Sequence, residues 1–264
     1  RDGKPYGLPR LEGRRRVTFL VHGKEKKKGS LLALCPHRRE AEIPLEDLRF
    51  FLKDQKTPSL LFPKWEPLPY DEIPPHPEII RERVRVLFSL LGGEKALIVS
   101  STKALMQKVL SPGDLKESVF SLSAGEETDR DRLIRFLQEG GYNSARVVEE
   151  RGDFSVRGAI IDVYTPFYEE PLRLEFDGDR IVSIRRFETE GQRSLPQGAM
   201  GNALLLPARD ISADASLQPL KPLFDYLKRD EILFLDEGDE IEKEAQSFSR
   251  LIDEHYQKAL LKKG

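Results

Sequence analysis

The residues of this chain best suited to ionic recognition are arginines placed among apolar residues. In the run Pro171–Phe176, Arg173 and Glu175 alternate with leucines, and Arg157 stands before a glycine in an earlier run. Side chains of a strand point alternately to its two faces, so Arg173 and Glu175 must share one face. A guanidinium group donates paired hydrogen bonds to a carboxylate. A half-solvated sheet with polar outer positions explains the same pattern, and composition alone favours that explanation.

These residues lie in a stretch, 151–194, whose pattern predicts an antiparallel meander. Ala159–Tyr164 is almost entirely apolar or β-branched, and short bends at 167–171 and 177–179 separate the following runs. Such bends join neighbouring antiparallel strands. The run Arg180–Phe187 alternates, which places Val182 and Ile184 on the face opposite Ile181, Ser183 and Arg185.

A strand and a helix precede the meander. The helix is expected to begin near Thr128 or Asp129, which can cap it, and to end at Gly140. One helix against an antiparallel sheet makes a small α/β unit, large enough for a core of its own.

The flanking segments predict a parallel α/β domain. Strand-like runs at Ser30–Pro36, Ser59–Trp65 and Ala96–Ser100 alternate with helix-like runs. A strand beginning at Ala203 is expected to return toward this domain, followed by a strand and a final helix. The predicted organisation is therefore a discontinuous domain, residues 1–117 and 204–264, with a smaller domain of residues 118–203 inserted.

A glycine loop near the start of the chain invites comparison with a phosphate-binding loop. Gly7 and Gly13 are one residue too far apart, and Arg14 and Arg15 stand where a lysine and a hydroxyl residue are needed. The lysine holds the outer phosphates and the hydroxyl ligates Mg²⁺. The pair Asp236-Glu237 imitates a Mg²⁺-binding strand end, but helix capping explains it better. We therefore expect no ATP hydrolysis.

Composition restricts the function classes further. The 264 residues carry 43 basic and 45 acidic side chains, a net charge of −2, which disfavours strong autonomous DNA binding. The run Lys24–Lys28 is best explained as a solvated turn, with nucleic-acid contact the weaker alternative. No apolar run reaches the length of a membrane span, and no signal peptide opens the chain. The chain begins with Arg1, which suggests a piece of a longer protein.

Metal and thiol chemistry find little support. The single Cys35 cannot form an internal disulfide, which suits a reducing cytoplasm. The histidines show no ligand spacing, so neither a structural nor a catalytic metal is expected; they are His22, His37, His76 and His255.

The amino-acid sequence of the meander resembles that of a known family. The ordered run RGDFSVRGAIIDVY…LRLEF…GDRIVSIRRFE…QRS closely resembles a segment shared by the nucleotide-excision-repair protein UvrB and the bacterial transcription-repair coupling factors. LFPKWEPLPYDEIPPHPEIIRERVRVL and ALIVSSTKALMQKVLSP resemble the coupling factors as well. The chain is thus similar to the amino-terminal, UvrB-homologous region of that family, most strongly from Leu61 to Ser194.

The resemblance implies a fold and a docking site. It implies a degenerate RecA/helicase-like α/β domain without working ATPase machinery, and an inserted domain that binds UvrA. Matched residue by residue, Arg157, Arg173 and Glu175 are the implied UvrA contacts, with Asp177 and Arg185 at the periphery. Relatives often have an aromatic residue where this chain has Asp177. Such docking requires the guanidinium groups to be displayed, not neutralised by the chain's own carboxylates.

The function that the resemblance implies is that of a non-catalytic adaptor, which recruits UvrA to lesions where RNA polymerase has stalled. It implies no cofactor, weak or indirect DNA contact, no membrane contact and a cytoplasmic location. The other implied partners are the motor and polymerase-binding domains of the coupling factor. One alternative is an ATP-dependent, UvrB-type damage-verifying enzyme, which needs an intact phosphate loop and an aromatic-rich hairpin. The other is a non-specific DNA-binding module.

Overall fold

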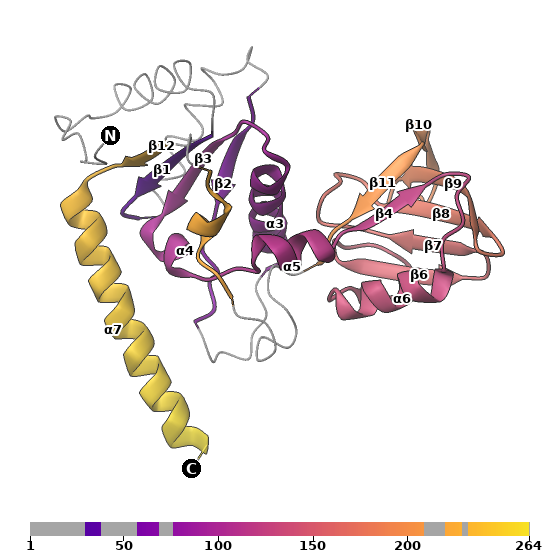
Figure 1. Ribbon diagram of the computed structural model, residues 1–264. Coiled ribbons are helices and arrows are strands. Elements are labelled where there is room, and N and C mark those ends of the chain that lie inside the picture. The colour runs from indigo at the N-terminus through magenta and orange to yellow at the C-terminus, as the bar shows by residue number, and fades with distance from the viewer. Residues whose placement is uncertain (1–29, 38–56, 69–75, 209–219, 229–231, 264) are drawn as a thin grey trace. The chain divides into compact units, whose positions relative to one another are not determined.

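The computed structural model describes residues 30–37, 57–68, 76–208, 220–228 and 232–263 (Figure 1). The glycine loop at 7–15 and the basic run Lys24–Lys28 lie outside these residues. The contacts divide the chain into two compact units. The first comprises residues 1–74, 92–107 and 227–264, and the second comprises residues 75–91 and 108–226.

The first unit contains a sheet of four parallel strands in the order β12-β1-β3-β2. Its central strands β1 and β3 are buried at every position, because a parallel sheet covered on both faces needs continuous apolar runs. The prediction of a parallel α/β arrangement is confirmed, whereas its RecA-like character stays a prediction. The strand bounds are Leu31–Cys35 for β1, Ser59–Phe62 for β2, Leu97–Ser101 for β3 and Ile232–Leu235 for β12.

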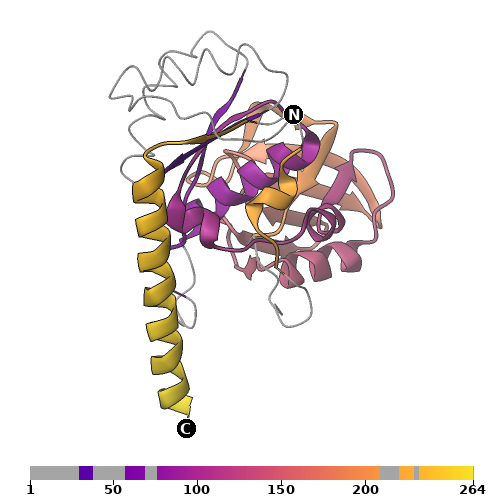
Figure 2. The ribbon, with the colours of Figure 1, turned by 60° about the vertical axis from the view of Figure 1, so that its left-hand side comes forward.

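Two helices of the first unit follow the ends of these strands. Helix α4 (Thr102–Met106) continues from β3, and the long α7 (Gly238–Lys263) follows β12. Figure 2 shows α7 running away from the edge of the sheet. Lys103 joins the two helices, since its Nζ lies 2.7 Å from Glu244 Oε1 and 5.8 Å from the centre of the Phe248 ring.

The second unit is built on a six-stranded sheet in the order β10-β9-β8-β7-β6-β5. Neighbours from β6 to β10 are antiparallel, which confirms the predicted meander, and β5 runs parallel to β6. Gly158 and Gly178 have φ values of +57° and +61° at the tight turns β6–β7 and β8–β9, where glycine avoids steric strain. The strands are β5 (Asn143–Ser144), β6 (Asp153–Arg157), β7 (Ile160–Val163), β8 (Leu172–Asp177), β9 (Arg180–Phe187) and β10 (Ser194–Met200).

Helix α6 (Arg130–Glu139) supplies the apolar cover of this sheet. Asp129 caps it by accepting a hydrogen bond from the Arg132 backbone N–H, and Gly140 follows its last turn, as predicted. Leu133 and Leu137 are fully buried in one core cluster with the inward residues of β6–β9. The remaining helices of the second unit are α3 (Pro77–Gly92, of which residue 92 falls in the first unit), α5 (Pro112–Glu117) and the 3₁₀ turn η1 (Leu223–Tyr226).

The strand that was expected to return to the first domain lies elsewhere. β11 (Asn202–Leu205) pairs antiparallel with β4 (Phe120–Ser123), and its Ala203 and Leu205 belong to the core of the second unit. That expectation is wrong because an apolar run does not reveal its partner strand. The three-segment assignment, with boundaries after residues 117 and 203, stays a prediction.

Strand β9 departs from the regular alternation expected for it. A β-bulge between Glu175 and Phe176 pairs Glu175 with Ser183 but Phe176 with Ile181. Val182 is the additional residue on β9, so Ile181 and Ile184 both enter the core while Val182 is 51% exposed. The expectation that Val182 shares the face of Ile184 is therefore wrong.

Candidate functional site

The polar face of the second unit's sheet is organised around one buried carboxylate. In the register of the sheet, Asp162 of β7 stands between Ser155 of β6 and Arg173 of β8, and Arg173 stands beside Arg185 of β9. The Asp162 side chain is 0% exposed. A buried carboxylate is costly unless it is paired and hydrogen-bonded, so its partners decide how this face is built.

Two arginines pair with Asp162. Arg173 donates twice, from Nε to Oδ1 at 2.7 Å and from Nη2 to Oδ2 at 2.9 Å. Arg157 donates from Nη2 to the same Oδ2. One negative charge therefore faces two positive charges, and the cluster of Asp162, Arg157 and Arg173 keeps a net positive charge.

Arg173 is held firmly and lies mostly under cover. Its Nη1 donates to the Gln192 carbonyl at 3.1 Å, and its guanidinium lies 4.5 Å from the centre of the Phe187 ring. The hydrogen bond to Asp162 raises the pKa of Arg173 above its ordinary value. Only 14% of its side chain is exposed. The expectation that both arginines are displayed is thus wrong for Arg173. The expectation that they are free of the chain's own carboxylates is wrong for both, because each pairs with Asp162.

Two chain segments cover this end of the polar face. Phe187, on the same side of β9 as Arg185, and Val148 are both fully buried. The Gln192 amide donates to the carbonyls of Val148 and Thr189, and Gln192 itself has a φ of +53°. That conformation is strained for a residue with a side chain. The carbonyl of this strained residue is the one that accepts the hydrogen bond from Arg173. The cover explains why Arg173 and Asp162 are shielded from solvent.

The other expected contact residues lie nearer the open end of the face. Arg157 is the last residue of β6, and 44% of its side chain is exposed. Glu175 is half-buried and accepts a hydrogen bond from Ser183 Oγ at 2.6 Å, next to the exposed Val182. Asp177 and Arg185 are exposed. The structure thus joins Arg157 and Arg173 through Asp162. Glu175 lies in the row of Arg157, with Ile160 between them, and one row away from Asp162 and Arg173.

Sequence reasoning missed Asp162, Phe187 and Gln192. A signal for Asp162 was present, because a single carboxylate inside the apolar run Ala159–Tyr164 must find a cationic or hydrogen-bonding partner. The arginines of the neighbouring strands were the available partners. Phe187 and Gln192 gave no comparable signal, since their roles depend on how the loop after β9 folds back.

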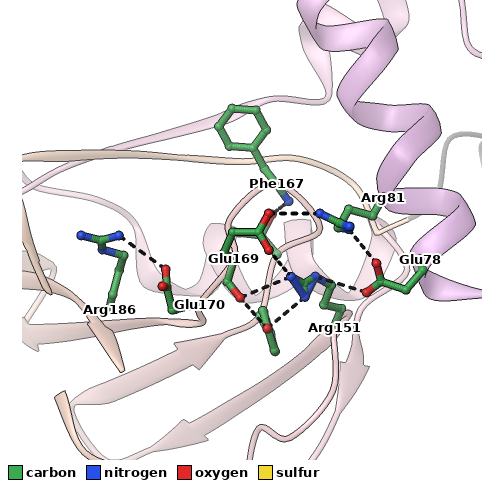
Figure 3. Close-up of polar contacts among 9 residues, drawn as sticks. Glu78, Arg81, Arg151, Phe167, Glu169, Glu170 and Arg186 are labelled. Carbon is green, nitrogen blue, oxygen red and sulfur yellow. Dashed lines mark hydrogen bonds and ion pairs between the residues drawn. The ribbon is translucent and has the colours of Figure 1, made fainter. Parts of the chain in front are cut away.

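A second charged cluster in this unit connects α3 to the β7–β8 loop (Figure 3). Arg151 pairs with Glu169 at 2.9 Å and with Glu78 at 3.5 Å, while Arg81 pairs with Glu78 at 2.8 Å and with Glu169 at 3.2 Å. Tyr164 accepts a hydrogen bond from Arg151 at 2.9 Å and donates to the Glu169 carbonyl at 2.6 Å. Two positive and two negative side chains close this ring, so it carries no net charge.

The electrostatics of the ring favour its ionised form. The hydrogen bond from Arg151 lowers the pKa of Glu169 below its ordinary value, with burial acting in the opposite direction. A shallow depression of about 340 Å³ lies beside the ring. Its lining residues carry both signs of charge: Arg85, Phe167, Tyr168, Glu169, Glu170 and Arg186. The neutral ring is suited to joining elements, whereas the Asp162 cluster retains the charge that a partner could use.

Within the described part of the chain, no group of three histidine, cysteine or acidic residues is placed to hold a metal ion. No helix among the described residues is long and apolar enough to cross a membrane.

Comparison with known proteins finds relatives for most of this chain. Residues 120–210 match the model of the UvrB interaction domain. A transcription-repair-coupling factor of Myxococcus xanthus is 35% identical over 224 residues, 83% of this chain and 18% of that protein. Those of Haemophilus influenzae and Escherichia coli are 37% and 31% identical over 154 and 212 residues, which are 58% and 80% of this chain and 13% and 18% of those proteins.

The chain is homologous to the bacterial transcription-repair-coupling factors. It spans less than a fifth of the length of these relatives. The UvrB interaction domain match includes the whole sheet from β5 to β10 and helix α6, and with them the Asp162 cluster.

Proposed function

We propose that this chain is a non-catalytic docking region of a transcription-repair coupling factor, and that it recruits UvrA for nucleotide-excision repair at stalled RNA polymerase. The match to the UvrB interaction domain supports a role in repair, because the matched residues include the positive face of the second unit. The partners are UvrA and, in an intact coupling factor, the motor and polymerase-binding domains. As part of a bacterial repair protein, the region works in the cytoplasm.

The observation that carries the proposal is the unequal charge around Asp162. Two guanidinium groups share one carboxylate, and the Arg157 side chain is 44% exposed. An acidic side chain of UvrA placed against Arg157 would complete the charge balance. Glu175, half-buried in the same row as Arg157 on the far side of Ile160, offers a carboxylate of opposite sign. Such paired signs fix the register of an interface.

No cofactor is needed for this role, and we propose that the region binds none. Docking of this kind uses shape and charge alone. DNA contact is proposed to be weak or indirect, since the net charge is −2 and duplex binding draws on an excess of basic residues.

The test is binding of the 264-residue chain to purified UvrA, measured by co-purification and by titration calorimetry. Truncating a charged residue that is hydrogen-bonded across an interface costs about 2–5 kcal/mol, so Arg157→Ala should weaken binding about 30-fold or more. Arg135→Ala is the matched control, because Arg135 is an exposed arginine of α6 on the other side of the sheet. Undiminished UvrA retention by an Arg157→Ala/Arg173→Ala chain would show that the docking face lies elsewhere.

A further inference from the structure

We propose that Arg173 serves docking without touching the partner: it satisfies Asp162 and thereby frees Arg157 to exchange Asp162 for a carboxylate of the partner. The inference rests on the proposed function, because it describes how that docking face works. Arg157 is then the contact, and Arg173 is a positioning residue.

The two arginines are bound to Asp162 in different ways. Arg173 is bidentate, is held further by the Gln192 carbonyl and the Phe187 ring, and exposes 14% of its side chain. Arg157 makes a single hydrogen bond to Oδ2 and exposes 44% of its side chain. Arg173 is therefore the fixed partner of Asp162, and Arg157 is the one that can leave.

The cost of that departure depends on Arg173. When Arg157 turns to a partner, Asp162 keeps two hydrogen bonds and a full counter-charge from Arg173. Without Arg173, a departing Arg157 would leave a fully buried carboxylate without either guanidinium, which is strongly unfavourable. Arg157 would then stay on Asp162 and be lost to the partner. The partner chemistry that fits is an acidic side chain presented to the end of β6.

The exchange predicts that removing the Asp162 charge repairs the loss of Arg173. Arg173→Met keeps an unbranched apolar stem against Phe187 and removes the guanidinium. This variant should bind UvrA about tenfold or more weakly than the native chain. Adding Asp162→Asn removes the charge that traps Arg157, so Asp162→Asn/Arg173→Met should bind at least about fivefold more tightly than Arg173→Met. Asp162→Asn alone should bind as tightly as the native chain or more tightly.

The measurement is titration calorimetry of each variant with UvrA, with thermal unfolding recorded to verify a cooperative fold. Arg173→Lys serves if Arg173→Met does not fold, since its ammonium group keeps a positive charge beside Asp162 but cannot make the two parallel hydrogen bonds. It should bind UvrA more weakly than the native chain, and Asp162→Asn/Arg173→Lys should bind more tightly than Arg173→Lys. If Arg173 had only a structural role, affinity for UvrA would follow the melting temperature across the variants. The exchange predicts instead that Asp162→Asn/Arg173→Met regains affinity whatever its melting temperature.

Three outcomes would overturn the inference. A double variant as weak as Arg173→Met would mean that Arg173 itself contacts UvrA. Native affinity of Arg173→Met would mean that Arg173 does not support docking. Weakened binding by Asp162→Asn alone would mean that Asp162 holds Arg157 in its docking position. In each of these cases Arg157→Ala should still bind UvrA more weakly than the native chain. Native affinity of Arg157→Ala would instead contradict the proposed function.

Discussion

Val182 is a side chain whose position depends on a single extra residue in β9. The bulge opposite Glu175 turns it outward, so that 51% of it is exposed beside Ser183, whose hydroxyl bonds Glu175. An exposed apolar side chain next to charged residues suits the centre of an interface, where charges are depleted.

We therefore expect Val182→Lys to weaken UvrA binding about three- to tenfold in titration calorimetry, because docking would have to desolvate an added ammonium group. Val156→Lys is the matched control. Val156 is 41% exposed but precedes Arg157 in β6 and so faces the opposite side of the strand. Equal losses from the two substitutions would argue against a specific contribution of Val182.

At the scale of residues, the sequence predicted which residues of β8 face the core but not which residues of the neighbouring strands contact its polar side chains. Leu172, Leu174 and Phe176 are buried, and Arg173 and Glu175 lie on the other face, as the period of two requires. That Asp162 needs a cationic partner could have been inferred from the apolar run around it, but its pairing with Arg173 depends on the register that sets the two side by side. The bulge was equally hidden, since Ile181 and Val182 are both apolar and either could have entered the core.

At the scale of elements, the ring of Glu78, Arg81, Arg151 and Glu169 ties helix α3 to the β7–β8 loop (Figure 3). The pKa of Glu169 is lowered in the folded chain from an ordinary value of 4.5. Its stabilising contribution is therefore complete above that ordinary value and is lost as the pH falls through the lowered folded pKa. Salt should weaken the contribution too, because 68% of the Glu169 side chain is exposed.

Glu169→Gln should accordingly lower the free energy of unfolding near neutral pH by about 0.2–1 kcal/mol, the range of exposed ion pairs. The difference from the native chain should shrink in acid and in high salt, which thermal unfolding across a pH and salt series measures. Glu170→Gln is the control, since the neighbouring carboxylate lies 3.4 Å from Arg186, outside the ring. A difference that persists unchanged in acid would contradict an ionic origin.

Elements with local signals were predicted better than those that depend on distant partners. The caps of α6 at Asp129 and Gly140 could be recognised because capping needs particular residues at particular positions. The pairing of β11 with β4 could not, because the run that begins at Ala203 is apolar enough for either sheet. The parallel sheet of the first unit was predictable as a class, while its order β12-β1-β3-β2 joins segments about two hundred residues apart.

At the scale of the whole chain, charge is distributed unevenly although the total is close to balance. The net charge is −2, yet the Asp162 cluster holds one more positive than negative group and the ring around Arg151 holds equal numbers. A local positive site in a slightly acidic molecule favours an acidic protein surface over the continuous phosphate backbone of DNA, which rewards many basic contacts at once. This distribution supports an adaptor over a DNA-binding module.

The same reasoning predicts how the chain responds to nucleotide and to DNA. Arg14 and Arg15 stand where a phosphate loop needs a lysine for the outer phosphates and a hydroxyl for Mg²⁺. Titration with labelled ATP should therefore show no saturation in the micromolar range, with UvrB as the positive control. Duplex DNA should bind at most weakly. Its affinity should fall steeply as the salt concentration rises, because added salt reduces the free energy gained from counterion release. Saturable micromolar ATP binding would contradict this expectation and would favour a nucleotide-dependent enzyme over the adaptor.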